Sequence, residues 1–329
     1  MPSAEPDPEV RGRFIADHNA LLELAGLPVT APIGVALSGG PDSVALLLLV
    51  AKIGAGPVKA MTVDHGLRAE AATEAEAAGA VATALGVPHQ IVRVTVAPAG
   101  EGVQGEARRA RYFALHKWAR EEGLAAVLTA HHADDQAETL LMRLARGAGV
   151  SGLAGIRPCR PIDERDPDGP KLLRPLLGWR KADLEAIVAA AGIEPARDPS
   201  NRDARFGRTA ARALLAETPW LDPARVAASA SHLRDAEEAL DTLAQRFFAE
   251  SCRVEDGYVL LAPGGAPRDI VRRALSLLFS RHFQVRPDGP GLDRLTAILG
   301  RGGTATLADV MATGGVTWRF RPAPPRRST

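Results

Sequence analysis

The sequence has 329 residues, of which 46% are hydrophobic and 24% charged, so it can bury a sizeable core in two or three domains. We expect neither a membrane span nor a secretory signal, because no apolar run reaches about 18 residues and the start of the chain is acidic and proline-rich. The two cysteines, Cys159 and Cys252, form no CxxC pair or zinc ribbon, which favours a cytoplasmic protein.

The net charge of +1 is unevenly distributed along the chain. The first 104 residues carry 6 Lys and Arg against 11 Asp and Glu, whereas the rest carry 34 against 28. A basic second half suits a polyanionic partner, but arginines on solvated faces would give the same count.

Strands and helices alternate in the first half of the chain. The expected elements are, in order, a helix at 11–27, a strand at 33–37, a helix at 42–52, a strand at 58–63, a helix at 70–85, a strand at 89–94, a helix at 104–122, a strand at 126–130 and a helix at 134–146. This alternation predicts an α/β fold with a doubly wound parallel sheet and helices on both faces.

The remainder of the chain is expected to be mainly helical. Its expected elements are an extended segment at 173–177, helices at 180–191, 225–251 and 268–283, and short strands at 304–307 and 317–321. Prolines around Trp220 indicate a boundary near 217–222. We therefore expect a catalytic domain at 1–217 and a smaller, mainly helical domain at 218–329 with a short β-containing tail.

A small-residue loop directly follows the first expected strand. Its residues are Ser38, Gly39, Gly40, Pro41, Asp42 and Ser43. Small residues let backbone N–H groups approach a phosphate closely, and the following helix directs its N-terminus at the anion. No Gly-Lys-Ser/Thr loop occurs, and no G-x-G-x-x-G fingerprint follows the first expected strand, which argues against kinases, GTPases and dinucleotide-binding enzymes.

Acidic and histidine residues follow the second and fourth expected strands. They are Asp64 and His65 after the second strand, and His131, His132, Asp134, Asp135 and Glu138 after the fourth. In a doubly wound sheet these strand ends face the ligand crevice. The side chains could hold a metal or act as a general base, although a helix cap is the ordinary role of such residues.

Arginines form two further groups. Arg108 and Arg111 are three residues apart on a helix, so they share a face and could clamp phosphates, or they could belong to a solvated face. The second group is Arg197, Arg202, Arg205, Arg208 and Arg212. Arginine-rich polar segments of this kind suit contact with an RNA backbone.

The loop at 38–43 resembles the PP-loop of N-type ATP pyrophosphatases, which cleave ATP between the α- and β-phosphates. The motifs together, over about Ile33 to Leu215, closely resemble the tRNA(Ile)-lysidine synthase family. That resemblance implies an ATP-dependent ligase that adenylates the wobble cytidine of a tRNA(Ile) with a CAU anticodon. The ε-amine of L-lysine then attacks C2 and releases AMP.

The resemblance also implies roles for the residues named above. ATP would be bound by residues 38–43 with Arg108 and Arg111, and Mg²⁺ by Asp42. Asp42, His131, His132 and Asp135 would be catalytic, Asp64, His65, Asp134 and Glu138 would bind lysine or cytidine, and the group of five arginines would bind tRNA. The oligomeric state stays open, a homodimer included. Two alternatives also stay open: a PP-loop tRNA thiolase, and a non-catalytic tRNA-binding protein of the same fold.

Overall fold

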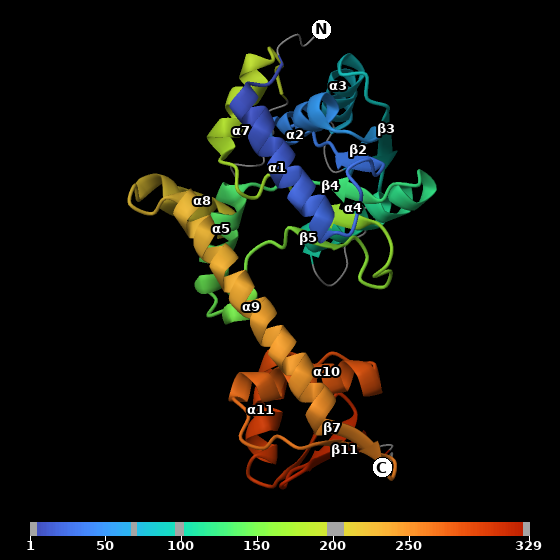
Figure 1. The fold of residues 1–329 in the computed structure, drawn as a ribbon, viewed down its shortest axis with the longest axis vertical. Coiled ribbons are helices and arrows are strands. Elements are labelled where there is room, and N and C mark those ends of the chain that lie inside the picture. The colour runs from blue at the N-terminus through green and yellow to red at the C-terminus, as the bar shows by residue number, and fades with distance from the viewer. Residues whose placement is uncertain (1–4, 67–70, 96–101, 196–206, 325–329) are drawn as a thin grey trace. The chain divides into compact units, whose positions relative to one another are not determined.

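The computed structural model describes residues 5–66, 71–95, 102–195 and 207–324 (Figure 1). The chain divides into two compact units, residues 1–233 and 234–329. The division falls inside one long helix, α9 (Pro223–Ser251). The boundary predicted at 217–222 lies just before that helix and stays a prediction.

The first unit is built on a mixed, mostly parallel sheet. Its strands are β1 (Ile33–Ala36), β2 (Val58–Asp64), β3 (His89–Arg93), β4 (Ala126–Leu128), β5 (Cys159–Pro161) and β6 (Lys171–Leu173). Among the described residues they form six strands in the order β3-β2-β1-β4-β6-β5, and only β5 is antiparallel to its neighbour. The predicted α/β sheet is confirmed, with this antiparallel edge strand as a difference.

Helices pack on both faces of this sheet. The described helices of the first unit are α1 (Pro8–Leu24), α2 (Pro41–Ile53), α3 (Ala71–Ala84), α4 (Gly102–Glu121), α5 (Ala133–Leu144), α6 (Val150–Leu153), α7 (Lys181–Ala190) and α8 (Gly207–Glu217). Alternate residues of a strand point to opposite faces. In β1, Ile33 and Val35 therefore pack with α1, α2 and α7, whereas Ala36 packs with α4.

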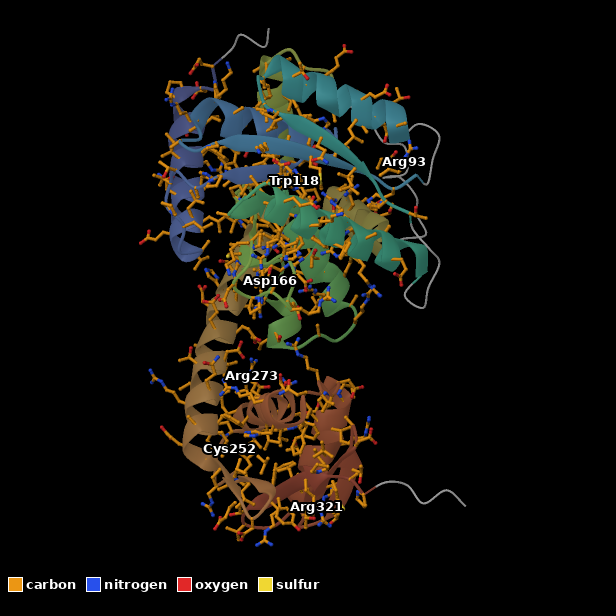
Figure 2. All side chains as sticks on the ribbon, turned by 90° about the vertical axis from the view of Figure 1, so that its right-hand side faces the viewer. Arg93, Trp118, Asp166, Cys252, Arg273 and Arg321 are labelled. Carbon is orange, nitrogen blue, oxygen red and sulfur yellow. The ribbon has the colours of Figure 1, made fainter. Side chains whose placement is uncertain are left out.

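Close packing between β1 and α4 depends on a glycine. A β-carbon added to Gly34 would lie only 2.4 Å from the nearest atom of the Trp118 indole, which is too close for two side chains. Trp118 is 3% exposed and lies within the first unit, between α4 and the sheet (Figure 2). Because side chains cannot overlap, only glycine at position 34 lets α4 lie this near the centre of the sheet.

The second unit is a sheet domain, so the prediction of a mainly helical C-terminal region was wrong. Its strands are β7 (Cys252–Glu255), β8 (Tyr258–Leu261), β9 (Thr304–Leu307), β10 (Val310–Thr313) and β11 (Trp318–Pro322). They form an antiparallel sheet in the order β7-β8-β11-β10-β9, packed with α10 (Arg268–Phe283) and α11 (Gly289–Leu299).

Two strands of this second sheet, β9 and β11, match the strands expected at 304–307 and 317–321, whereas β7, β8 and β10 were not expected from the sequence. Each has four or five residues, and tight turns join neighbouring strands. Asp256 and Gly257 both have positive φ between β7 and β8, as do Ala308 and Asp309 between β9 and β10. An Asp-Gly pair is a strong hairpin signal, and its presence could have identified the first of these hairpins from the sequence.

Two smaller observations complete the fold. Both cysteines are free thiols. In the described part of the chain, no helix is long and apolar enough to cross a membrane.

Candidate active site at the carboxyl ends of the strands

The phosphate loop joins β1 to α2 at the centre of the sheet. Gly39 has φ of +84°, a conformation that favours glycine, and the Ser43 hydroxyl donates to the carbonyl oxygen of Gly40 at 2.9 Å. The Ser38 amide donates to Ser43 Oγ at 3.1 Å. No side chain caps the N-terminus of α2, so its first amide groups point toward the loop without a side-chain acceptor. This arrangement suits a bound anion.

A cavity of about 220 Å³ opens beside this loop. Its lining includes Ser38 from the loop, Met61, Asp64 and His65 from the end of β2, and Arg111 from α4. Of the two predicted clamp arginines, Arg111 thus lies next to the loop. A second cavity, of about 400 Å³, lies between α1, α2 and α7 and contains none of the predicted site residues.

The parallel pairing of β1 with β4 brings the histidine motif to the same sheet edge. Val35 of β1 is level with Leu128 of β4, so the residues that follow each strand are neighbours. His132 is the N-cap residue of α5, and its Nε2 lies 3.6 Å from Asp42 Oδ2 of the phosphate loop. The two sequence motifs therefore meet across the point where the strand order reverses.

His132 is surrounded by carboxylates. Besides Asp42, the Oδ2 atoms of Asp134 and Asp135 each lie 3.6 Å from a ring nitrogen. Burial opposes charge on the ring, but hydrogen bonds to Asp134 and Asp42 and the charge of Asp135 outweigh it and raise the pKa of His132 to about 10. The Asp135 amide also lies 3.4 Å from Nδ1, a long contact that would need a neutral ring. Three carboxylates outweigh one long hydrogen bond, so His132 is an imidazolium at neutral pH.

His131, the adjacent residue, has the opposite environment. Its Nδ1 lies 3.0 Å from the hydroxyl of Thr129. Burial lowers the pKa of His131 well below its ordinary value, and the charges of Arg174, Arg111, Arg108 and Arg208 lower it further. The ring is therefore neutral at neutral pH, and the same burial and arginine charges oppose its protonation unless negative charge nearby offsets them.

Asp134 contacts the N-terminus of α7. Its carboxylate accepts the backbone amide of Lys181 at 2.9 Å and pairs with Arg180 at 3.3 Å, at the N-terminus of α7. Burial opposes this charge, but hydrogen bonds from His132, Lys181 and Arg180 lower the pKa of Asp134. Because these contacts occupy the carboxylate, its predicted role in lysine binding stays a prediction.

Asp64 is similarly engaged. Its side chain is 4% exposed and accepts the Gly66 amide at 2.8 Å and the Arg93 guanidinium at 3.0 Å. Arg93 comes from the neighbouring strand β3 (Figure 2). The Gly66 hydrogen bond is the main cause that lowers the pKa of Asp64. Next to it, burial and the charge of Arg111 lower the pKa of His65, and its Nδ1 has no hydrogen-bond partner.

A carboxylate with one free oxygen lies on α5. Glu138 is 2% exposed; its Oε1 accepts Arg212 Nε of α8 at 2.8 Å, and its Oε2 has no hydrogen-bond partner among the residues that the structure describes. Of the predicted tRNA-binding arginines, Arg212 thus contacts the site directly. Arg208 lies near enough to lower the pKa of His131. Arg197, Arg202 and Arg205 lie outside the described residues.

A cation would fit beside the phosphate loop. Asp42 Oδ1 is buried and has no hydrogen-bond partner within the described ranges, and a carboxylate oxygen of this kind next to a phosphate site suits Mg²⁺. No group of three or more His, Cys, Asp or Glu side chains of the described ranges is arranged to hold a metal by itself. This agrees with the usual mode of Mg²⁺, which combines one or two carboxylates with substrate phosphates.

Several contributors to the site were not predicted. Thr129 orients His131, Arg180 engages Asp134, and Arg174 is a buried arginine whose charge acts on His131. Thr129 and Arg180 give no sequence signal, because their partners are set by packing. Arg174 could have been noticed, since an arginine directly after the apolar residues of a strand is unusual.

The fold and the site define a PP-loop nucleotide-binding enzyme. The family model of the PP-loop domain matches residues 17–218. The chain is 44% identical to the tRNA(Ile)-lysidine synthase of Novosphingobium aromaticivorans, with 96% of this chain and 94% of that protein covered. It is 41% identical to the tRNA(Ile)-lysidine synthase of Zymomonas mobilis, with 94% of each covered. The chain belongs to the tRNA(Ile)-lysidine synthase family of PP-loop proteins.

A solved structure supports the fold alone. A U34-tRNA thiolase from Methanococcus maripaludis with its [4Fe-4S] cluster matches with a TM-score of 0.54 at 18% identity, over 68% of this chain and 80% of that one.

Proposed function

We propose that the protein joins L-lysine to C2 of the wobble cytidine of a tRNA(Ile) with a CAU anticodon, using ATP, and so forms lysidine. The observation that carries this proposal is the meeting of an uncapped phosphate loop with a neutral and a charged histidine at one sheet edge. The reaction needs a phosphate cradle for activation and a neutral base for an amine nucleophile.

The first half of the reaction is the activation of cytidine. The loop amides and Arg111 would bind the phosphates of ATP, and the cavity beside β2 would take part of the nucleoside. The cytidine carbonyl oxygen attacks the α-phosphate and pyrophosphate leaves, which turns that oxygen into part of a leaving group. Mg²⁺, held by Asp42, would neutralise phosphate charge in this half-reaction.

The second half is the attack of lysine. An ε-ammonium must be held by a carboxylate and lose a proton before it is a nucleophile. Glu138 Oε2 is a buried acceptor without a partner among the described residues, so it is the strongest candidate to hold the ammonium. His132 already carries a proton and His131 is neutral, so His131 would be the base; the negative phosphates bound nearby would offset the arginine charges that lower its pKa. The amine nitrogen then bonds to C2, the C2–O bond breaks and AMP leaves.

The test combines two assays on wild type and His131→Gln. Wild type should release pyrophosphate only with the CAU tRNA present and should then increase the mass of the anticodon nucleoside by one lysine minus one water. H131Q should keep tRNA-dependent exchange of pyrophosphate into ATP but form lysidine about 10²–10⁴-fold more slowly. His116→Gln, which alters a half-buried histidine paired with Asp166, is the matched control.

Two results would contradict the proposal. Incorporation of sulfur from a sulfur donor, with no lysine added, would favour the thiolase alternative. Binding of tRNA without pyrophosphate release under any condition would favour the non-catalytic alternative.

A further inference from the structure

A buried arginine that has no carboxylate counterion among the described residues lies directly after β6. Arg174 is 3% exposed; it donates from Nη1 to the carbonyl oxygen of Arg157, and its Nε has no hydrogen-bond partner in the part of the chain that the structure describes. Within the described ranges it has no ion pair with a carboxylate. Burial is the main cause that lowers its pKa; the interaction with Tyr112 opposes this, and the charges of Arg160 and Arg108 lower it further. Because an uncompensated buried charge costs several kcal/mol, such a site is built to receive an anion.

Further cations gather on one aromatic ring beside Arg174. The guanidinium groups of Arg160 and Arg108 lie 4.7 Å and 5.0 Å from the centre of the Tyr112 ring. Arg160 also donates to the carbonyl oxygens of Pro161 at 2.8 Å and Ile162 at 3.2 Å, which fixes its position. Neither Arg160 nor Arg108 forms an ion pair among the described residues. The ring thus holds like charges together without a carboxylate to balance them.

The strands that carry Arg160 and Arg174 separate these two arginines from the phosphate loop, whereas Tyr112 lies on α4 next to Arg111, which lines the cavity beside that loop. Arg160 and Arg174 come from β5 and from the end of β6, whereas the loop follows β1, and β4 lies between them in the sheet. At about 4.8 Å per strand, β6 lies roughly 10 Å from β1. His131, at the end of β4, lies between the two sites and feels the charge of Arg174 most strongly among its neighbours.

We propose that Arg160, Arg174 and Tyr112 form a second phosphate site, which holds a phosphodiester of the RNA strand next to the reacting nucleotide. The inference rests on the proposed function, because it takes RNA as the substrate. Arg174 and Arg160 supply N–H donors, and the Tyr112 hydroxyl supplies one more. A phosphate fixed here would leave the attached base within reach of His131 and of the phosphate loop on its other side.

A free nucleotide phosphate has the same chemistry, so the experiment must separate the two sources. We would measure binding of the CAU tRNA and of ATP to the full-length protein for wild type and Arg160→Gln. R160Q should weaken tRNA binding about tenfold and lower the slope of log affinity against log salt by about 0.7, the value for one contact to a single strand. The affinity for ATP should stay unchanged.

The matched control is Arg165→Gln. Arg165 lies five residues after Arg160, in the segment between β5 and β6. Its side chain is 81% exposed and pairs with Asp163. Its substitution removes the same charge without altering the proposed site. Arg174→Lys adds a second test: lysine keeps the charge but not the planar fork of donors, so tRNA binding should weaken. If R174K does not fold, the R160Q result alone decides whether the phosphate site exists.

Each outcome has a distinct meaning. Weaker ATP binding with unchanged tRNA binding would overturn the inference and assign the site to the nucleotide. Equal effects of R160Q and R165Q on tRNA would overturn it as well. If R160Q weakens tRNA binding but wild type forms no lysidine, the proposed function fails while the RNA phosphate site stands.

Discussion

The charge of His132 gives the protein a pH-dependent stability that can be measured directly. His132 is buried among three carboxylates, and its pKa in the folded protein is about 10 against an ordinary 6.5. We would replace it with asparagine. Asn is a good N-cap residue, so His132→Asn provides a side-chain acceptor for the first turn of α5 and removes the positive charge.

The magnitude follows from the two pKa values. One pH unit of difference corresponds to about 1.4 kcal/mol, so a rise from 6.5 to about 10 stabilises the imidazolium by up to about 5 kcal/mol. Because the folded pKa is raised, this stability is fully present below pH 6.5 and is lost as the pH rises through about 10. We expect the unfolding free energy of wild type to fall between these values by several kcal/mol more than that of H132N.

Urea unfolding at a series of pH values provides the assay, with the ring nitrogens of His132 followed by NMR as a direct titration. His232→Asn is the control, since His232 is an exposed histidine of α9. H132N should be less stable than wild type at pH 6 and approach it at high pH. Parallel stability curves for the two proteins, or an imidazole that titrates near pH 6.5, would refute the assignment of a charged His132.

Three further substitutions test other parts of the structure. Gly39→Ala should cost about 1–2 kcal/mol, because φ of +84° strains a residue with a β-carbon, and should weaken ATP binding; an unchanged melting temperature would contradict this. Arg212→Met leaves the buried carboxylate of Glu138 without its partner, so urea unfolding should show a loss of about 1–3 kcal/mol, which Glu138→Gln in the same protein should partly restore. Arg273→Met removes the partner of three carboxylates of α9 and α10 in the second unit (Figure 2) and should lower the free energy of unfolding by about 3–5 kcal/mol. Unfolding can be followed by the fluorescence of buried Trp318. A smaller loss than for the exposed Arg253→Met would show that the network contributes little.

Much of the first unit was predictable because its signals are local. The apolar runs that precede the phosphate loop and the histidine motif are strands within one or two residues of the expected bounds. Alternation of such strands with helices allows few topologies. The sheet of the second unit was not predictable in the same way, since four-residue strands gain their stability from pairing with segments far away in the sequence.

The sequence by itself determined which residues have the chemistry for the site. A loop such as Ser38–Ser43 adopts its shape through bonds between near neighbours, so its composition is enough to indicate phosphate binding. The sequence also placed the histidines and carboxylates after strands, and therefore at one edge of the sheet.

Only the tertiary structure decided which of these residues are charged and which hydrogen-bond partners each one has. His131 and His132 are adjacent in the chain, yet one faces arginines from α4 and β6 and the other faces carboxylates from α2 and α5. Likewise Asp134 is bound to the start of α7, whereas Glu138 keeps a free oxygen in the site. The protonation state of a side chain and its hydrogen-bond partners depend on the charged and polar groups within a few ångströms. Those groups come together only once distant segments have packed.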